Sequence, residues 1–357
     1  MNIAVIFGGK STEHDVSVLT ALFVTNALKG CEVYPVHIDR ENRWRTGAFS
    51  RISDLADMRE CALFPGGVLA RKRVNRYRSL AKIDCAVNCC HGGSGENGDL
   101  AGTLALLGVP VTSSEPFSSR VAMNKILTKR CLPEGVRTAE YAVLKKGARD
   151  AAFAAARFGL PLVVKPASGG SSIGISVCRE EGELADALSL AFSLDEEVLL
   201  ERYVPDFKEV NCAIYRGPKG LVLSKLESPG RRSDILSFDE KYLNFSKQSG
   251  DREFPAVLPA ETEREILETT ARVYEFLGMS GIVRMDYMVA GQEVYFNEIN
   301  SVPGSLAFYL FERDFSEVLS EVVAQAVAKF RERETLVRSF SSELLAASTA
   351  GAKTARK

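Results

Sequence analysis

Apolar and polar positions alternate along residues 283–299 in a pattern typical of two β-strands joined by a short turn. Residues 283–289 and 293–299 carry strand-forming side chains, and Gly291 lies in the turn between them. We therefore predict a β-hairpin here. Because successive side chains of a strand point to opposite faces, Arg284 and Asp286 share one face of the hairpin.

The hairpin is expected to bring oxygen ligands together. Folding it places Asp286 opposite Asn297 or Glu298, and Glu298 shares a face with Asn300. Two carboxylates and an amide oxygen suit Mg²⁺, which proteins usually hold through one or two carboxylates together with substrate phosphates and water. An exposed hairpin with scattered charges is the alternative. The apolar flanks and the rigid Ser-Val-Pro-Gly-Ser run at 301–305 favour a metal–nucleotide site.

The N-terminal pattern is that of a parallel α/β unit. Residues 2–7 form a short apolar strand, a glycine turn follows, and residues 17–28 have helical apolar spacing. A P-loop is excluded because it needs a glycine five residues before Gly9, where the chain has Ala4. Glu13 precedes the predicted helix, where it either complements the helix dipole or binds a substrate ammonium.

A glycine-rich loop at residues 92–98 follows His91 and a predicted strand at 81–89. Adjacent Cys89 and Cys90 point to opposite faces of a strand and no second ligand pair follows, so a metal site is discounted here. A loop that lets backbone approach a small substrate fits the glycines better. Another strand is expected at 31–38, and a short edge strand at 108–112 closes this part of the chain.

Residues 71–78 form a run of basic side chains with one tyrosine. Such a run is either a nucleic-acid patch or a solvated surface excursion. The surface excursion is favoured because the whole chain has a formal net charge of −1.

The middle of the chain combines lysines with a loop rich in glycine and serine. Lys125 lies on a helix expected at 120–131, and Lys165 ends a strand expected at 160–166. The loop at 168–174 is either a plain hairpin tip or a cradle in which backbone N–H groups bind phosphate oxygens. The two lysines favour the phosphate interpretation.

Further elements follow towards the C-terminus. The strand expected at 196–204 offers backbone groups to an adenine, and Glu209 is a candidate acceptor for ribose hydroxyls. The polar stretch at 235–254 is expected to close over a reaction centre, and residues 341–357 are expected to fray. The remaining elements are a helix at 180–194, strands at 210–215 and 221–226, and helices at 261–277 and 315–333.

Composition limits the class of protein. A chain of 357 residues with 46% hydrophobic and 25% charged residues suits two or three ordinary globular domains. The near-zero net charge supplies no global field to recruit nucleic acid or membrane. Eight irregularly spaced cysteines, without a secretory signal, indicate reduced thiols, and no apolar run approaches the ~18 residues of a membrane span. We therefore expect a cytoplasmic protein with neither nucleic acid nor membrane as a partner.

Five segments, taken in order from residue 2 to about residue 329, resemble the motifs of the D-alanine–D-alanine ligases, a family of the ATP-grasp superfamily. Each is weak alone, but the ordered set is specific. The segments are Gly-Gly-Lys-Ser-Thr-Glu at 8–13 through Ser17, 91–98, Lys-Pro at 165–166 with 170–174, Glu-Lys-Tyr at 240–242, and Arg-Met-Asp at 284–286 with 297–300 and Pro-Gly at 303–304.

This resemblance implies an α/β fold of three domains. They are an N-terminal parallel-sheet domain at 1–118, a central ATP-grasp domain at 119–205 and a C-terminal catalytic domain at 206–335, with a tail at 336–357. ATP is then held between the sheets of the central and C-terminal domains. The family also implies a homodimer, and Mg²⁺ with Mn²⁺ as an alternative metal.

The resemblance further assigns roles to individual residues. The nucleotide contacts are Lys125, Lys165, Ser172, Glu201, Val204, Glu209 and Lys241. The metal ligands are Asp286, Glu298 and Asn300. Glu13 receives the ammonium of the first substrate, linked through Ser171 to Tyr242, while Arg284 and the Gly304 amide stabilise an oxyanion. His91, Tyr309 and Leu310 contact substrate.

The implied reaction is the ATP-dependent ligation of two D-alanines through a D-alanyl phosphate, giving D-alanyl-D-alanine for peptidoglycan. Three positions depart from the family pattern: Asn124 replaces an aspartate, Ala101 replaces a glutamine, and Tyr309 falls on a serine that binds the terminal carboxylate. Because of Tyr309, D-serine, D-lactate or another amino acid stays open as the second substrate. Tyr242 favours an amine nucleophile. A nucleotide-binding protein without catalysis is the alternative from another class.

Overall fold

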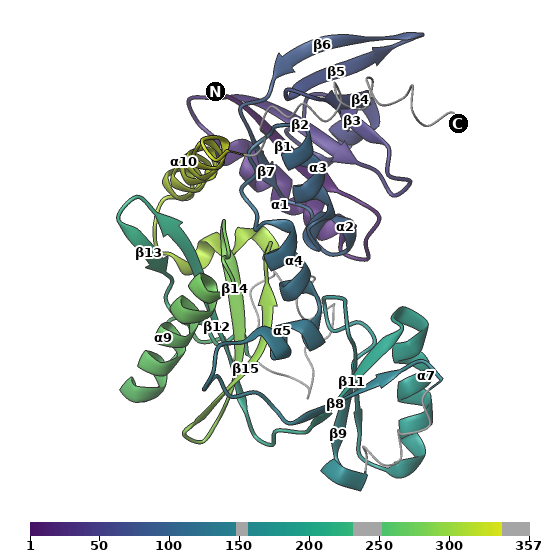
Figure 1. The fold of residues 1–357 in the computed structure, drawn as a ribbon, viewed down its shortest axis with the longest axis vertical. Coiled ribbons are helices and arrows are strands. Elements are labelled where there is room, and N and C mark those ends of the chain that lie inside the picture. The colour runs from purple at the N-terminus through teal and green to yellow at the C-terminus, as the bar shows by residue number, and fades with distance from the viewer. Residues whose placement is uncertain (148–155, 231–251, 338–357) are drawn as a thin grey trace, which may run out of the picture.

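The computed structural model describes residues 1–147, 156–230 and 252–337, which form three β-sheets with helices packed against them (Figure 1). The N-terminal sheet has the strand order β6-β5-β4-β3-β2-β1-β7. Its parallel part comprises β1 (Asn2–Gly8), β2 (Glu32–Ile38) and β7 (Cys85–Asn88). The predicted parallel α/β unit is thus confirmed. Antiparallel strands extend it: β3 (Trp44–Thr46), β4 (Arg59–Phe64), β5 (Val68–Arg73) and β6 (Arg76–Lys82).

This antiparallel extension was not predicted. The strand expected at 81–89 is interrupted, because β6 ends at Lys82 and β7 begins at Cys85. The basic run lies in the β5–β6 hairpin, so it belongs to the sheet. The expected edge strand at 108–112 is reduced to a single bridge between Val111 and Ala86.

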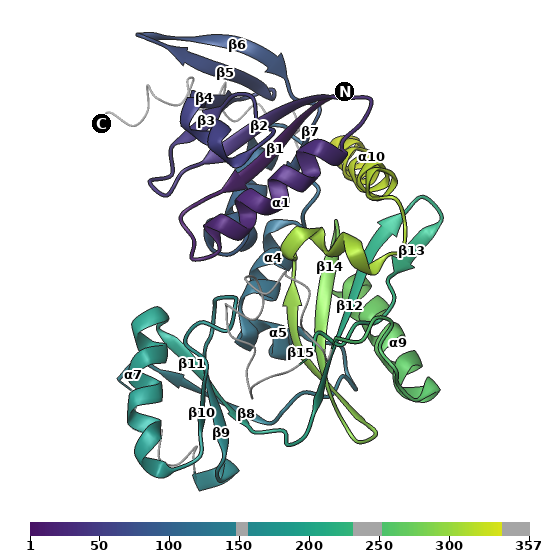
Figure 2. The ribbon, with the colours of Figure 1, turned by 180° about the vertical axis from the view of Figure 1, so that it is seen from behind.

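Helix α1 (His14–Ala27) packs against β1, as Figure 2 shows. Beyond β7 the chain forms short helices, and the single helix expected at 120–131 is in fact two. Asn124 is extended (φ −106°, ψ 110°) and its side chain accepts a hydrogen bond from the Leu127 N–H, so it caps a new helix. These helices are α2 (Gly93–Glu96), α3 (Asp99–Leu106), α4 (Pro116–Met123) and α5 (Lys125–Cys131), with η1 (Ile52–Asp57) earlier in the chain.

The central sheet has the order β10-β9-β11-β8 and is covered by α7 (Leu184–Leu194). The expected helix at 180–194 begins as a separate 3₁₀ turn, η2 (Glu181–Glu183). The strand pair flanking the Gly/Ser loop is antiparallel, as predicted. The strands are β8 (Tyr141–Lys145), β9 (Leu162–Pro166), β10 (Ser176–Cys178) and β11 (Glu197–Arg202).

The C-terminal sheet has the order β13-β12-β14-β15. Its apolar face packs against α9 (Ala260–Phe276), and the large side chains of Tyr274, Tyr287 and Phe296 are fully buried there. The strands are β12 (Lys208–Gly217), β13 (Gly220–Leu223), β14 (Val283–Ala290) and β15 (Glu293–Asn300), followed by η3 (Gly304–Leu310) and α10 (Phe315–Glu334).

The N-terminal and C-terminal sheets share one apolar core. Val5 and Phe7 of β1, Tyr215 of β12, and Val318 and Leu319 of α10 all belong to it. Helix α10 therefore packs on α1 and β7 of the N-terminal part and on β12 of the C-terminal sheet. The domain boundaries expected from the sequence stay a prediction. None of the helices in the described ranges combines the length and apolar character that crossing a bilayer requires.

Candidate active site

The β14–β15 hairpin is confirmed, and its register is now fixed. Asp286 lies directly opposite Glu298, and Arg284 lies opposite Asn300. The register shifts between Asp286 and Tyr287, so Asn297 is the extra residue of a β-bulge. The sequence alone did not decide whether Asn297 or Glu298 lies opposite Asp286. The bulge explains why, because it adds one residue to β15 at this point.

Asp286 is a buried carboxylate, 1% exposed, that is held by a neighbouring guanidinium. Arg284 Nε donates to Asp286 Oδ1 at 2.7 Å and Arg284 Nη2 donates to Oδ2 at 2.8 Å. The Asn300 amide donates to the same Oδ2 at 3.0 Å. A bidentate pair of this kind fixes orientation as well as charge.

The donor set of Asp286, Glu298 and Asn300 fits a hard divalent cation. All three carry oxygen atoms at the same end of one hairpin, and Arg284 together with the Asn300 amide uses three of the roughly four lone-pair sites that the Asp286 carboxylate offers. Only two of the three are carboxylates. Accordingly, the described ranges contain no cluster of three or more His, Cys, Asp or Glu side chains placed to bind a metal.

A group of lysines surrounds a second buried carboxylate, Glu201 of β11. Lys165 Nζ lies 2.6 Å from Glu201 Oε2, and Lys129 Nζ lies 3.0 Å from Oε1. Burial alone would raise the pKa of Glu201, but the two ammonium groups outweigh it and lower that pKa to about 2. Burial lowers the pKa of Lys129. The site thus holds two positive charges around one negative charge.

Lys129 was missed by sequence reasoning. It follows Lys125 by one helical turn on α5, and this i, i+4 spacing was the available signal. Lys125 Nζ itself donates to the Gly169 carbonyl at 2.7 Å and lies 3.8 Å from Glu298 Oε2. Lys125 therefore lies near the Gly/Ser loop, as expected, and also near the hairpin, which was not predicted.

Lys165 joins the central and C-terminal sheets, because its Nζ also donates to Asn297 Oδ1 at 3.2 Å. The pocket between the two sheets contains most of the residues expected at the nucleotide. It is lined in part by Lys165, Ser172, Glu201, Val204, Glu209, Asn297 and Glu298. Val204 is 8% exposed and packs with Met288 of β14, which gives the pocket an apolar wall.

The Gly/Ser loop of the central sheet contacts the start of α1. Ser171 Oγ donates to Glu13 Oε1 at 2.5 Å. A side chain at Gly170 would meet Glu13 Oε2 at 2.5 Å, so any larger residue there would displace the Glu13 carboxylate. Ser171 and Ser172 have φ of 54° and 59°, a left-handed conformation that non-glycine residues adopt infrequently. The loop is thus held against the N-terminal part of the chain.

His91 is buried between α1 and the loop that follows β15. Its Nδ1 lies 2.7 Å from the Val302 carbonyl and its Nε2 lies 2.8 Å from Thr20 Oγ1. Because a carbonyl only accepts, Nδ1 carries the proton and Nε2 accepts from Thr20. Thr20 Oγ1 in turn accepts from the Ser305 N–H at 3.0 Å. Burial lowers the pKa of His91, which suits this neutral tautomer.

Glu96 of α2 is a further buried carboxyl that sequence reasoning missed. Its Oε1 accepts from the Val302 N–H at 3.0 Å and its Oε2 accepts from the Gly92 N–H at 2.9 Å. Burial, followed by the charge of Glu13, raises the pKa of Glu96 to about 7. The only sequence signal was that Glu96 is the single acid inside the glycine-rich loop.

The turn that begins at Gly304 has an unusual backbone. Ser305, Leu306 and Ala307 have φ of 51°, 51° and 47°, which makes one left-handed turn. Tyr309 and Leu310 follow it, and the Leu310 carbonyl accepts from the Lys225 N–H at 3.1 Å. The turn is therefore anchored at both ends, by Thr20 before it and by Lys225 after it.

The side chain of Arg252 stacks on the Tyr309 ring. The Arg252 guanidinium carbon is 5.5 Å from the centre of the Tyr309 ring, and Arg252 Nε donates to Glu227 at 2.6 Å. Burial, followed by the charge of Glu227, raises the pKa of Tyr309 to about 12. Sequence reasoning did not identify Arg252. Lys241 and Tyr242, expected at the phosphate and the first substrate, lie outside the described residues.

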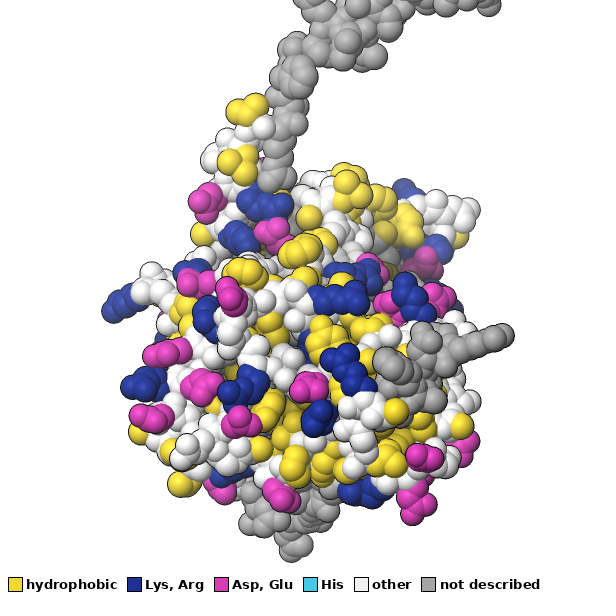
Figure 3. Space-filling view, turned by 60° about the horizontal axis from the view of Figure 1, so that its bottom comes forward, with side chains coloured by type: hydrophobic (Ala, Val, Ile, Leu, Met, Phe, Trp, Pro, Cys, Tyr) yellow, Lys and Arg dark blue, Asp and Glu magenta, His cyan; other side chains and the backbone are white. Residues whose placement is uncertain are grey.

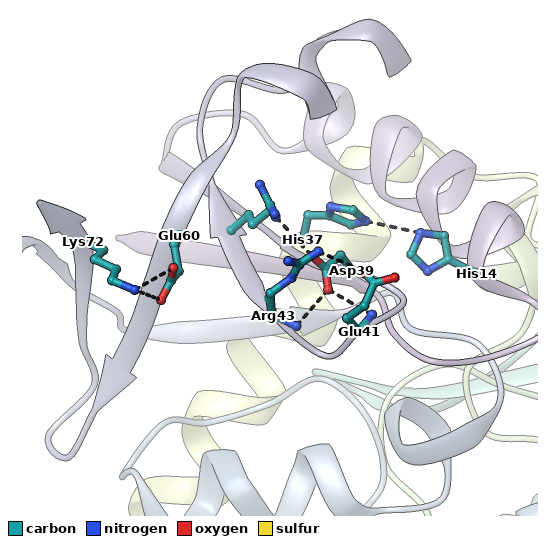
Figure 4. A network of polar contacts seen from close by, with 8 residues as sticks. His14, His37, Asp39, Glu41, Arg43, Glu60 and Lys72 are labelled. Carbon is teal, nitrogen blue, oxygen red and sulfur yellow. Dashed lines mark hydrogen bonds and ion pairs between the residues drawn. The ribbon is translucent and has the colours of Figure 1, made fainter. Parts of the chain in front are cut away.

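Figure 4 shows a separate polar network beside the glycine turn. His14 Nδ1 lies 2.8 Å from the Gly9 carbonyl, and its Nε2 is 3.3 Å from His37 Nε2. Burial, and then the proximity of His14, lowers the pKa of His37 to about 4. Asp39 accepts hydrogen bonds from Arg43 and Arg45 and orders the next turn. This network supports the glycine turn from outside the pocket.

Comparison with known proteins places these features in one family. The family model described as "D-ala D-ala ligase N-terminus" matches residues 2–114, and "D-ala D-ala ligase C-terminus" matches residues 133–319. A D-alanine–D-alanine ligase of Wolinella succinogenes is 36% identical over 332 residues, 90% of this chain and 92% of that protein. One from Helicobacter pylori strain P12 is 33% identical, over 92% and 95% of the two chains.

Solved structures give the same result. The D-alanine–D-alanine ligase of Helicobacter pylori superposes with a TM-score of 0.76 at 30% identity, covering 91% of this chain and 98% of that chain. The D-Ala:D-Ser ligase VanG of Enterococcus faecalis superposes with a TM-score of 0.75 at 27% identity, covering 91% and 99%.

Proposed function

The chain belongs to the D-alanine–D-alanine ligase family, and from this premise we propose that it joins two D-alanines with ATP, giving D-alanyl-D-alanine for peptidoglycan synthesis. The observation that carries the proposal is a chain of contacts between the three parts of the molecule. Ser171 after β9 of the central sheet donates to Glu13 before α1. Lys165 of β9 donates to Asn297, which adjoins Glu298 in the C-terminal hairpin.

The first step is activation of a carboxylate. An oxygen of the first D-alanine attacks the γ-phosphorus of ATP, ADP leaves, and an acyl phosphate results. Lys125 and Lys165 are assigned to the phosphates, because both ammonium groups lie beside the Gly/Ser loop or the hairpin. Asp286, Glu298 and Asn300 would hold Mg²⁺ or Mn²⁺, which when bound neutralises phosphate charge.

The first D-alanine is positioned by Glu13. This carboxylate is 6% exposed and accepts a hydrogen bond from Ser171, so one of its oxygens is oriented by the loop. A buried carboxylate is a strong partner for an ammonium group, and the charge pair fixes the amino end while the carboxylate reacts. The neutral His91 adds no competing positive charge.

The second step forms the peptide bond. The amine of the second D-alanine attacks the acyl carbon, phosphate leaves, and the amine loses a proton. Negative charge develops on the carbonyl oxygen, and Arg284 with the Gly304 amide are assigned to stabilise it. Arg284 is suited to this because Asp286 already fixes the direction of its guanidinium plane. Preorganised donors of this kind cost no reorganisation during the reaction.

Three finer points belong to the proposal. D-alanine is the second substrate, with D-serine, D-lactate or another amino acid as the alternative at the Tyr309 pocket. The reaction takes place in the cytoplasm, which is supported by the free thiols of all eight cysteines. The protein is a homodimer, as the family implies.

The decisive experiment measures ADP release with MgATP and D-alanine and reads the product mass from the same reaction. We expect release that depends on D-alanine, together with the mass of D-alanyl-D-alanine. Glu298→Gln is expected to abolish release, whereas Glu293→Gln, an exposed acid at the far end of β15, is expected to leave it intact. ATP binding without D-alanine-dependent release in the wild-type chain would refute the ligase activity.

A further inference from the structure

The β5–β6 hairpin gathers arginines on one face. The two strands of this hairpin form a two-stranded ribbon. Within the ribbon, Arg71 lies opposite Arg78, and Arg73 lies opposite Arg76. Directly opposed residues point to the same side of a ribbon, and positions two apart on one strand do so as well. All four guanidinium groups therefore project from a single face, as two like-charged pairs. Such pairs destabilise a ribbon, so the arrangement has no structural advantage.

These four arginines make no ion pair or hydrogen bond through their side chains to any residue in 1–147, 156–230 or 252–337. Arg73, Arg76 and Arg78 are exposed and Arg71 is half-buried. The opposite face of the ribbon is different, because Lys72 pairs with Glu60 at 2.7 Å (Figure 4). Elsewhere on the molecule, on the face in Figure 3, basic and acidic side chains are interspersed.

The tip of the ribbon presents an apolar side chain. Val74 is 91% exposed and has a φ of 39°. A β-branched residue rarely adopts this left-handed conformation, and it does so here between Arg73 and Asn75, without burying its methyl groups. The ribbon thus combines an exposed apolar tip with a cationic face directly behind it.

From these features we propose that the β5–β6 ribbon docks on an anionic lipid membrane surface. Arginine binds phosphate oxygens through two parallel N–H groups, which suits phospholipid headgroups. An apolar tip that enters the interface beside basic residues is the usual chemistry of peripheral attachment. The net charge of −1 gives no long-range attraction, so binding depends on this local cluster.

Two other kinds of partner fit less well. Single-stranded nucleic acid is held by exposed aromatic rings on which bases stack, but Tyr77 lies on the opposite face, in a T-shaped contact with Phe64 at 5.4 Å. A protein partner requires a well-packed apolar centre, but the exposed apolar side chains here are Val74 at the tip and Leu80 farther along β6, with Arg76 and Arg78 between them in the chain.

The ribbon is separate from the proposed active site. β6 is the outer edge of the N-terminal sheet, and β1 and β7 lie at its other edge, where the sheet meets the C-terminal part of the chain. Figures 1 and 2 show the ribbon projecting from the end of the molecule farthest from the C-terminal sheet. Docking there leaves the pocket accessible, and the inference does not depend on the proposed ligase activity.

The test is co-sedimentation of the full chain with vesicles rich in phosphatidylglycerol and with vesicles of phosphatidylcholine alone. We expect binding to the anionic vesicles only, weakening as salt rises. The double variant Arg73→Gln/Arg76→Gln should bind about 25-fold more weakly, at roughly fivefold per arginine. Val74→Asp should also weaken binding, because it places a carboxylate at the tip.

The matched control is Arg40→Gln/Arg120→Gln. It changes the net charge by the same amount, but both arginines are exposed and paired, with Asp15 and Asp99. We expect it to bind like the wild type, and both double variants should retain ADP release. Equal binding to both vesicle types, binding to neither, or equal losses in the two double variants would overturn the proposal. Tighter binding to single-stranded RNA than to the anionic vesicles would also overturn it.

Discussion

Ser171 and Glu13 are 158 residues apart in sequence, yet the hydroxyl of one donates to the carboxylate of the other at 2.5 Å. The contact ties the Gly/Ser loop of the central sheet to the start of α1. It fixes the side chain that is assigned to the ammonium of the first substrate. The loop that is expected near phosphate and the acid that is expected near the amine are therefore positioned together.

Removing this hydroxyl is expected to weaken binding of the first D-alanine. Ser171→Ala removes a hydrogen-bond donor that orients Glu13, and a hydrogen bond to a charged group contributes about 1.5–3 kcal/mol. We expect the KM for the first D-alanine to rise at least about tenfold in steady-state ADP release. Ser168→Ala in the same loop is the control, because the Ser168 side chain contacts Asn124 rather than Glu13. An unchanged KM in Ser171→Ala would contradict the assigned role.

The buried Glu201 is expected to be important for stability. Glu201→Gln leaves the ammonium groups of Lys129 and Lys165 close together without their counter-charge, and breaking a buried pair costs about 3–5 kcal/mol. We expect a loss of this size in the free energy of unfolding, measured with urea at pH 7. Glu60→Gln, which removes the half-exposed partner of Lys72, should change it by about 1 kcal/mol or less.

The lowered pKa of Glu201 also predicts how the stability of the protein depends on pH. Because the pKa of Glu201 is lowered from 4.5 to about 2 in the folded chain, its contribution to stability is present above pH 4.5 and is lost as the pH falls towards 2. The free energy of unfolding of the wild type should therefore decline more steeply in this window than that of Glu201→Gln. Parallel curves for the two proteins would show that the pKa of this carboxyl group is the same in the folded and the unfolded chain.

The raised pKa of Glu96 predicts a loss of stability with rising pH, opposite to the effect of Glu201. The pKa of Glu96 is raised from 4.5 to about 7, so its contribution to stability is fully present below pH 4.5 and is lost as the pH rises through 7. A shift of this size corresponds to about 3 kcal/mol. We expect the Tm of the wild type to fall between pH 5 and pH 8, and Glu96→Gln to flatten that part of the curve. A wild-type Tm that is constant across this range would contradict the raised pKa.

The side chains around Tyr309 are expected to select the second substrate. Arg252 stacks on the Tyr309 ring and is held there by Glu227, so it offers a positive charge to a carboxylate beside the ring. Arg252→Gln should raise the KM for the second amino acid about tenfold and leave the KM for the first unchanged. Arg216→Gln, whose partner is the surface acid Glu275, is the control. Equal effects on both KM values would place Arg252 outside this group of side chains.

The hairpin was the most predictable part of the site. Alternation of faces placed Asp286 near Glu298, and the structure has them directly opposed. The bulge at Asn297 was not predictable, because a single extra residue changes the register without changing the hydrophobic pattern. The break at Asn124 was missed for a related reason: a capping side chain replaces a helical residue within a continuous polar–apolar pattern.

Residues whose environment depends on distant elements were harder to find. From the sequence, Lys129 has the features of a surface lysine of α5. It is buried only because β11, which is distant in sequence, places Glu201 beside it. From the sequence, Glu96 is one polar residue of a glycine-rich loop. Its buried environment depends on the loop at Val302, whose N–H donates to it. The basic run at 71–78 is largely exposed, as a surface excursion predicts, but composition alone does not reveal that β5 and β6 align its arginines. The catalytic and ligand-binding roles assigned from the family stay predictions, as do those of Lys241 and Tyr242.

The core shared by β1 and α10 affects how the chain reaches its native state during translation. Val5 and Phe7 leave the ribosome long before Val318 and Leu319, which cover the same core and follow them by more than 300 residues in the sequence. A nascent polypeptide therefore exposes this apolar surface for most of its synthesis. A truncated chain that ends before α10 should be captured by chaperones or degraded, even with its proposed reaction centre fully translated.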